Sequence, residues 1–167
     1  MSLSETLLWH DYETFGANPR YDRPVQFAAL RTDLDLNPIG EPICLFAKPP
    51  RDYLPEPGAC LVTGITPQEA ETKGVPEAEF IAAVHEVMTQ PGTCAVGYNS
   101  LRFDDEVTRF TLYRNLRDAY SREYGQGRSR WDLIDAVRTA YALRPEGIEW
   151  PRRDDAHALA PDALDRA

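Results

Sequence analysis

The sequence predicts an α/β domain in which a mixed β-sheet is flanked by helices. Two observations lead to this class. Three strand-like segments follow one another near the N-terminus, and helix-like and strand-like segments alternate after them. The chain has 167 residues and is 43% hydrophobic, which suffices for one sizeable core without metal or disulfide cross-links. We therefore expect one domain, alone or with a short tail.

Short apolar segments that end at polar or proline residues predict the strands. The first three cover residues 6–12, 24–32 and 43–47. Because their connections are short, we expect antiparallel pairing among them. Residues 92–98 predict a fourth strand, and the proline-rich stretch 49–58 is expected to be a loop.

Start signals and helical periodicity predict the other elements. Thr66 suits a helix cap, Pro67 the first helical position and Glu69 the third, while Gly74 can end that helix. Further helices are expected from Pro76, after a cap at Asn99-Ser100, and over residues 131–143, with a polar loop over residues 117–130.

Charge and cysteine content narrow the class of protein. The net charge of −9 argues against a polyanionic partner, but residues 101–144 hold nine arginines against seven acids. Arginine suits bidentate contacts with phosphate, although a solvated helical face would also explain this segment. Three widely spaced cysteines form neither a disulfide framework nor a zinc site. With no secretory leader and no membrane-length apolar run, we expect a reduced, cytoplasmic protein.

Two carboxylates at the end of the first predicted strand form the first candidate site. Strand alternation places Asp11 and Glu13 on one face and Tyr12 on the other. The two carboxylates would repel each other in a partly buried place, and a hard divalent cation would offset that repulsion. An acidic strand end that runs into a solvated turn explains the same residues.

A second acidic group, Asp104 to Glu106, opens the helix after the fourth predicted strand. Acids in a first helical turn complement the helix dipole without any further function. Alternatively, an aspartate just inside this helix, beside an acidic strand end, would complete a two-cation phosphoryl-transfer site.

The stretch from His10 to Gly16 (HDYETFG) resembles the first motif of the DEDD exonucleases, and specifically of the bacterial exonuclease I family. Further segments resemble that family in order and spacing over residues 5–154: Asp22-Arg23-Pro24, Gln26–Ala29, Leu61–Pro67, Gly97-Tyr98-Asn99, Arg102–Glu106, Arg130–Leu133 and Tyr141–Gly147.

The resemblance implies a ribonuclease-H-like fold and 3′→5′ removal of nucleotides from single-stranded DNA, in DNA repair and recombination. Asp11, Glu13 and Asp104 match three of the family's four acidic ligands of two Mg²⁺ ions, with Mn²⁺ as a substitute. Glu13 is also expected to contact the substrate.

The resemblance further implies contacts with DNA and with a protein partner. Residues matched to DNA contacts are Thr14, Phe15, the segment Leu61 to Thr66, Arg109, Tyr120, Tyr124 and Arg138. Arginine for phosphate and tyrosine for base stacking suit single-strand binding, and surface positions without function are the alternative. Arg144 matches a basic position that receives the acidic C-terminus of single-stranded-DNA-binding protein.

The C-terminal part departs from the family. The fourth acid and the general base should come from a late His-x-x-x-x-Asp motif, and only His157 and Asp162 have that spacing. Pro161 lies between them, where it would disrupt a helix by about 3 kcal/mol or more, so we interpret the spacing as a coincidence. We therefore expect an incomplete exonuclease domain over residues 1–154 and a divergent tail over 155–167. An uncovered sheet face could then promote dimerisation.

Three other functions remain open from the sequence. The chain could bind metal and single-stranded DNA without turnover. It could be an exoribonuclease of the same superfamily. It could also be a non-nuclease α/β domain whose acids serve as helix caps.

Overall fold

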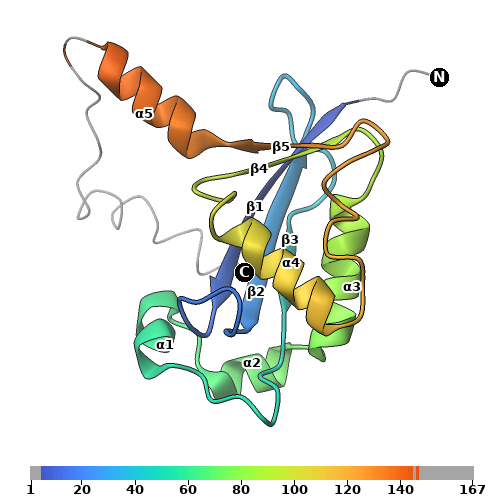
Figure 1. Ribbon diagram of the computed structural model, residues 1–167, viewed down its shortest axis with the longest axis vertical. Helices are drawn as coiled ribbons and strands as arrows, with labels where there is room; N and C mark the ends of the chain where they lie inside the picture. The colour runs from blue at the N-terminus through green and yellow to red at the C-terminus, as the bar shows by residue number, and fades with distance from the viewer. Residues whose placement is uncertain (1–4, 145, 147–167) are drawn as a thin grey trace. The chain divides into compact units, whose positions relative to one another are not determined.

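A five-stranded mixed sheet forms the centre of the N-terminal part of the chain (Figure 1). The computed structural model describes residues 5–144 and residue 146. The chain divides into two units, Met1–Leu133 and Ile134–Ala167, and the sheet lies in the first of them.

The strands are β1 (Thr6–Thr14), β2 (Pro24–Thr32), β3 (Ile43–Phe46), β4 (Thr93–Gly97) and β5 (Ser129–Asp132), in the spatial order β3-β2-β1-β4-β5. The first three pair antiparallel, which confirms the expectation from their short connections. The other two pairings, β1 with β4 and β4 with β5, are parallel. The mixed sheet predicted from the order of elements is therefore present.

The helices are α1 (Pro57–Thr63), α2 (Pro67–Lys73), α3 (Glu77–Met88), α4 (Asp104–Arg114) and α5 (Leu133–Leu143). The predicted start of α2 is confirmed, because the Thr66 side chain accepts a hydrogen bond from the Glu69 N–H. The sequence prediction missed α1. That helix buries none of its residues and so shows no amphipathic pattern.

Helices α3 and α4 cover one face of the sheet. Their buried side chains, among them Phe80, Val84 and Leu112, pack with Leu8 and Phe27 from the sheet in one hydrophobic cluster. Figure 1 shows α4 lying across the sheet with α3 beside it. A second, smaller cluster lies around Phe15, at the end of β1.

Two boundaries near the site were predicted wrongly. The long helix begins at Asp104 rather than after a cap at Asn99-Ser100, because Asn99 adopts a left-handed turn conformation with φ of 59°. The segment that starts at Trp131 is first a strand, because Trp131 pairs with Val96 and Asp132 pairs with Gly97. A parallel edge strand this short has no recognisable period of its own.

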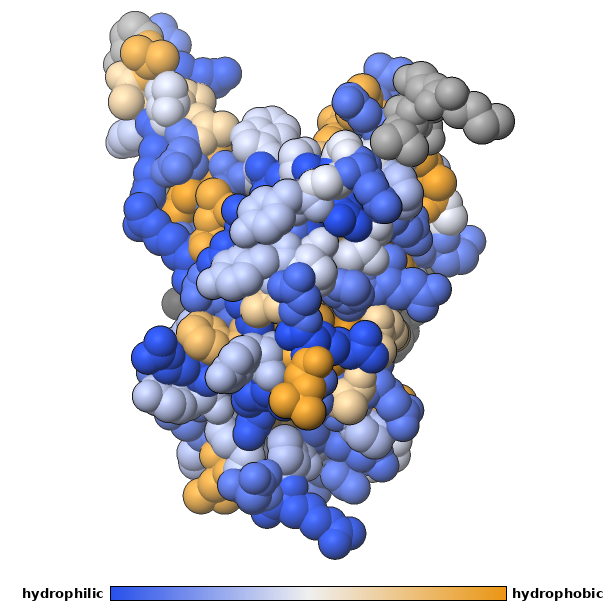
Figure 2. Space-filling view, turned by 45° about the vertical axis from the view of Figure 1, so that its right-hand side comes forward, coloured by the Kyte–Doolittle hydropathy of each residue, from blue (hydrophilic) through white to orange (hydrophobic). Residues whose placement is uncertain are grey.

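The face of the molecule drawn in Figure 2 is largely hydrophilic. On the face drawn in Figure 2, hydrophobic residues lie in small separate groups among polar ones. The three cysteines, Cys44, Cys60 and Cys94, are free thiols. Among the described residues, none of the helices combines the length and the apolar character that a membrane crossing requires.

Candidate active site

The two carboxylates of the first motif lie on the sheet face opposite α3 and α4. Along β1, Leu8, His10 and Tyr12 are buried, whereas Asp11 is exposed and Glu13 is half-buried. Tyr12 packs against Phe27 and Phe80 in the core. The shared face expected for Asp11 and Glu13 is therefore present.

Asp104 reaches the same strand from the start of α4. Its Oδ1 accepts a hydrogen bond from the Tyr12 backbone N–H at 3.0 Å. The pairing between β1 and β4 ends at Trp9 and Val96, so β4 offers no partner this far along β1. The carboxylate of Asp104 takes that place, and it brings the acidic start of α4 to the strand that carries Asp11 and Glu13.

The turn between β4 and α4 is held by close packing and by Asp132. A Cβ on Gly97 would lie 2.6 Å from the Cβ of Ser100, so the turn can approach the strand only because residue 97 is glycine. Asp132, at the end of β5, accepts hydrogen bonds from the N–H groups of Asn99 (2.8 Å) and Leu101 (3.1 Å). Asp132 thereby fixes the chain that leads into Asp104.

The three carboxylates share an environment that opposes their negative charge. Burial, and then the charge of Asp11, raise the pKa of Asp104 to about 7. Burial and the charge of Asp11 also raise the pKa of Glu13, and partial desolvation of its carboxyl group raises the pKa of Asp11, although that residue as a whole is exposed. Asp11 thus acts on both of the other carboxylates, and a bound cation would relieve the repulsion.

The donor atoms suit a hard divalent cation such as Mg²⁺, which prefers carboxylate oxygens. Within the described part of the chain, however, no three His, Cys, Asp or Glu side chains stand close enough together to form a complete metal site. As they stand, Asp11, Glu13 and Asp104 supply at most part of the ligand set of a cation, which would need further ligands from substrate, water or protein.

A cavity of about 540 Å³ adjoins Glu13. Thr14 and Gly16 line it from the end of β1, Val62 and Thr63 line it from α1, and Phe103 also contributes. Its volume lies within the range of small-molecule sites. The segment Leu61 to Thr66, expected from the resemblance to meet the DNA end, thus lies at a cavity shared with Glu13.

Thr14 and Phe15, predicted to contact DNA, have internal partners. The Thr14 hydroxyl donates a hydrogen bond to the Gly16 carbonyl at 2.7 Å. The Phe15 side chain is fully buried, and its carbonyl accepts hydrogen bonds from the Glu56 N–H and the Tyr53 hydroxyl. The structure therefore gives Phe15 a packing role, and a side-chain contact with DNA would require it to leave the core.

Arg109, Tyr120 and Tyr124 lie on α4 and the loop that follows it. Both tyrosines are exposed, and the guanidinium of Arg109 lies 5.3 Å from the ring centre of Tyr120. Arg109 also forms ion pairs with Glu106 and Glu123. The tyrosine rings are thus accessible, whereas the charge of Arg109 is already compensated.

Other predicted residues lie in the second unit. Arg138 is exposed on α5 and pairs with Asp135 at 3.6 Å, and Arg144 is exposed just after α5. His157 and Asp162 lie outside the described residues, as does the boundary expected between residues 154 and 155.

An ion-pair network next to Asp104 was missed in the sequence. Asp105 is buried and pairs with Arg122, which is also buried, and with Arg130 at 2.6 Å. Arg130 continues to Glu123 at 3.2 Å. The arginine-rich composition of residues 101–144 hinted at this network, but the partners of each arginine are set by tertiary contacts.

The sheet order, with acidic side chains on β1 and at the start of the helix after β4, defines a ribonuclease-H-like domain of the nuclease type. The chain belongs to the exonuclease family, since the model of that family, described as "Exonuclease", matches residues 8–160.

The chain is also similar to individual members of this family. Over 150 residues it is 59% identical to exodeoxyribonuclease I of Escherichia coli (strain K12), a match that covers 90% of this chain and 32% of that protein. The chain therefore spans about a third of the length of this relative.

Two solved structures show what such relatives bind. One is a complex of exonuclease I with the single-stranded-DNA-binding protein C-terminus (TM-score 0.85, 58% identity, 91% of this chain and 33% of that chain). The other is the zinc-bound complex of E. coli exonuclease I with single-stranded DNA (TM-score 0.85, 58% identity, 89% of this chain and 32% of that chain).

Proposed function

We propose that this chain provides the nuclease site of a metal-dependent 3′→5′ exonuclease that hydrolyses single-stranded DNA. The observation that carries the proposal is the hydrogen bond that holds Asp104 to β1, the strand that bears Asp11 and Glu13, where burial and the charge of Asp11 raise the pKa of Asp104. The similarity to exodeoxyribonuclease I supports DNA as the substrate.

Within this proposal the protein's own residues bind and orient. Asp11, Glu13 and Asp104 would hold the metal ions, and Glu13 would also face a terminal nucleotide in the adjoining cavity. When bound to these carboxylates, two Mg²⁺ ions, or Mn²⁺ in their place, would supply the chemistry that lowers the pKa of an attacking water and offsets charge on a leaving 3′ oxygen. The Tyr12 N–H, by holding Asp104 Oδ1, sets the orientation of that carboxylate.

Exposed residues are proposed to bind the DNA strand and a protein partner. We propose that Tyr120 and Tyr124 stack on bases and that Arg109 and Arg138 contact the strand. Arg144, which is exposed, is proposed to receive the acidic C-terminus of single-stranded-DNA-binding protein. A reduced cytoplasmic location and roles in DNA repair and recombination belong to the same proposal.

Digestion of a 5′-labelled single-stranded DNA oligonucleotide with Mg²⁺ tests the proposal. We expect a ladder that shortens from the 3′ end and that is absent with Asp11→Ala. An RNA oligonucleotide of the same sequence tests the exoribonuclease alternative and should be cut more slowly. Preferential RNA cleavage, or a ladder that persists in Asp11→Ala, would contradict the proposal.

A binding module without turnover is the second candidate function. The similarity to exodeoxyribonuclease I does not favour it, but the described residues supply only part of a metal site, so it is worth a test. In that case Mn²⁺ would stabilise the protein against thermal unfolding, Asp11→Ala would remove this stabilisation, and the oligonucleotide would stay intact. If His157 and Asp162 complete the site instead, His157→Ala would abolish cleavage.

Light scattering tests the proposed formation of a dimer, and a clean monomer would contradict that proposal.

A further inference from the structure

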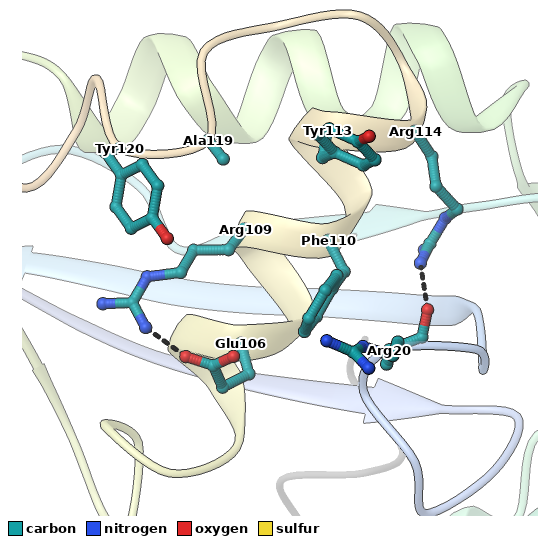
Figure 3. A pocket seen from close by; sticks show the side chains of 8 residues that line it. All are labelled: Arg20, Glu106, Arg109, Phe110, Tyr113, Arg114, Ala119 and Tyr120. Carbon is teal, nitrogen blue, oxygen red and sulfur yellow. Dashed lines mark hydrogen bonds and ion pairs between the residues drawn. The ribbon is translucent and has the colours of Figure 1, made fainter.

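A hollow of about 590 Å³ lies on the outer side of α4, away from the sheet. Arg20, Glu106, Arg109, Phe110, Tyr113 and Tyr120 are among its lining residues (Figure 3). It is separate from the cavity beside Glu13, with which it shares no lining residue. Neither the carboxylates of the candidate active site nor the network around Asp105 explains why such a hollow is present.

Helical geometry accounts for the position of the hollow. Glu106, Phe110 and Tyr113 recur at spacings of four and three residues and therefore share one face of α4. Val107, Thr111 and Leu112 are buried on the other face. Among the described residues, the face that lines the hollow is thus the one that does not contribute to the buried core.

The cations around the hollow differ in how far their charge is compensated. Arg109 pairs with Glu106 and Glu123, and Arg114 pairs with Glu77 at 3.5 Å. The ion pairs found among the described residues include none to Arg20. Its guanidinium instead lies 5.3 Å from the ring centre of Phe110, while the Arg114 side chain donates to the Arg20 carbonyl at 3.3 Å. Arg20 is thus held at the rim with its charge available to an anion.

The aromatic rings around the hollow are open to solvent. Tyr113 is 70% exposed and Tyr120 is 51% exposed. Figure 3 shows both rings at the hollow, together with the arginine side chains. Exposed aromatic rings next to guanidinium groups are the combination that binds unpaired nucleotides, because bases stack on the rings and phosphates pair with arginine.

We infer that this hollow is a second nucleotide-binding site, which holds an unpaired nucleotide of the strand upstream of the 3′ end. Tyr113 carries its base, and Arg20 binds its phosphate. The inference rests on the proposed function for the strand itself, and it extends the strand's path beyond Arg109 and Tyr120 to residues that the sequence did not single out. Since α4 rises about 1.5 Å per residue, Tyr113 lies about 14 Å along the helix from Asp104. Only a substrate longer than the terminal nucleotides can therefore reach the hollow.

The test compares affinity and cleavage for two substrate lengths. Binding of a labelled twelve-nucleotide oligo(dT) is followed by fluorescence anisotropy in EDTA, and hydrolysis of the same oligonucleotide and of a dinucleotide is followed with Mg²⁺. We expect Tyr113→Ala and Arg20→Ala to weaken binding of the long strand by about tenfold and about threefold. Dinucleotide hydrolysis should be unchanged in both variants.

Matched variants control for general effects on charge and folding. Tyr113→Phe keeps the ring and should bind as the unchanged protein does. Arg51→Ala removes an exposed arginine outside the hollow and should also have no effect. Equal affinity of all variants for the long strand would overturn the inference while leaving the proposed nuclease intact. If the unchanged protein neither binds nor cleaves the oligonucleotide, both the inference and the proposed function fail.

Discussion

Asp104 and Asp105 are adjacent in the sequence and buried, yet their surroundings are opposite. Asp104 faces the carboxylate of Asp11, and its pKa is raised to about 7. Asp105 is held between the guanidinium groups of Arg122 and Arg130. At the start of α4, one aspartate thus faces another acid, whereas the negative charge of the following aspartate is paired with two arginines.

The difference teaches how to separate a functional carboxylate from a structural one. A buried acid that is paired with arginines has its charge satisfied within the fold, and it joins parts of the chain to each other. A buried acid that faces other acids destabilises the fold unless something else binds there. We therefore assign Asp104 to the candidate metal site, and Asp105 to anchoring β5 and the segment between α4 and β5 against α4.

The largest expected effect is on cleavage. Asp104→Asn keeps an oxygen that can accept the Tyr12 N–H bond but removes the negative charge that a cation needs. We expect the rate of hydrolysis of single-stranded DNA to fall by roughly a thousandfold, measured as single-turnover cleavage under saturating Mg²⁺. Glu106→Gln, at a half-buried acid two residues along the same helix, should retain most of the activity. Comparable losses in both variants would contradict the distinction.

The next largest effect is expected on protein stability, when the buried ion pair between Asp105 and Arg122 is removed. Arg122→Met should lower the free energy of unfolding by about 3 kcal/mol, because it leaves Asp105 buried with only the pairing to Arg130. Lys73→Met removes the exposed pair with Glu69 and should cost about 0.3–0.5 kcal/mol. Urea unfolding of the two variants measures both values. A loss below about 1 kcal/mol for Arg122→Met would show that this pair does not anchor the loop.

The pH dependence of stability should also separate the two aspartates. The pKa of Asp104 is higher in the folded state than the ordinary value of 3.8, so the folded state binds its proton more tightly. Without metal, this contribution is fully present below about pH 4 and is lost as the pH rises through about 7. Relative to Asp104→Asn, the unchanged protein should lose about 2 kcal/mol between about pH 5 and pH 8. Chemical unfolding in EDTA at both pH values measures this difference, and parallel profiles would contradict it.

A smaller effect is expected at Asp132. Its carboxylate accepts two backbone hydrogen bonds in the turn before α4, one on each oxygen, whereas Asp132→Asn leaves a single oxygen that can accept from only one side. We expect a loss of about 1 kcal/mol in stability and a several-fold fall in cleavage, since the turn positions Asp104. Unfolding and cleavage are measured on the same preparation. Unchanged cleavage would show that the turn does not depend on Asp132.

Much of the fold could be predicted because its elements carry local patterns. The strands β1 and β2 have short apolar sequences, and the start of α2 has a cap that acts within four residues. The helix α1 and the strand β5 could not be predicted in the same way. The first buries no side chain, and the second is a four-residue strand defined by its pairing with β4.

The candidate site was predictable to a similar extent. Alternation placed Asp11 and Glu13 on one face, and the resemblance to exonuclease I singled out Asp104. The roles of Asp132 and Arg122 depend on contacts between distant parts of the sequence. Asp132 binds backbone groups that lie 33 and 31 positions before it, and Arg122 lies 17 positions after Asp105. No local pattern encodes such contacts. The same limit applies to Phe15, whose burial follows from packing with Val25 and Ile65.

The most direct test of the assignment of Asp104 to a metal site is thermal unfolding at about pH 8, with and without Mg²⁺. A cation that binds only the folded state raises the unfolding midpoint. We predict that Mg²⁺ raises the midpoint of the unchanged protein and of Glu106→Gln, but not that of Asp104→Asn. An equal rise in Asp104→Asn, or no rise in the unchanged protein, would contradict the assignment of Asp104 to a metal site.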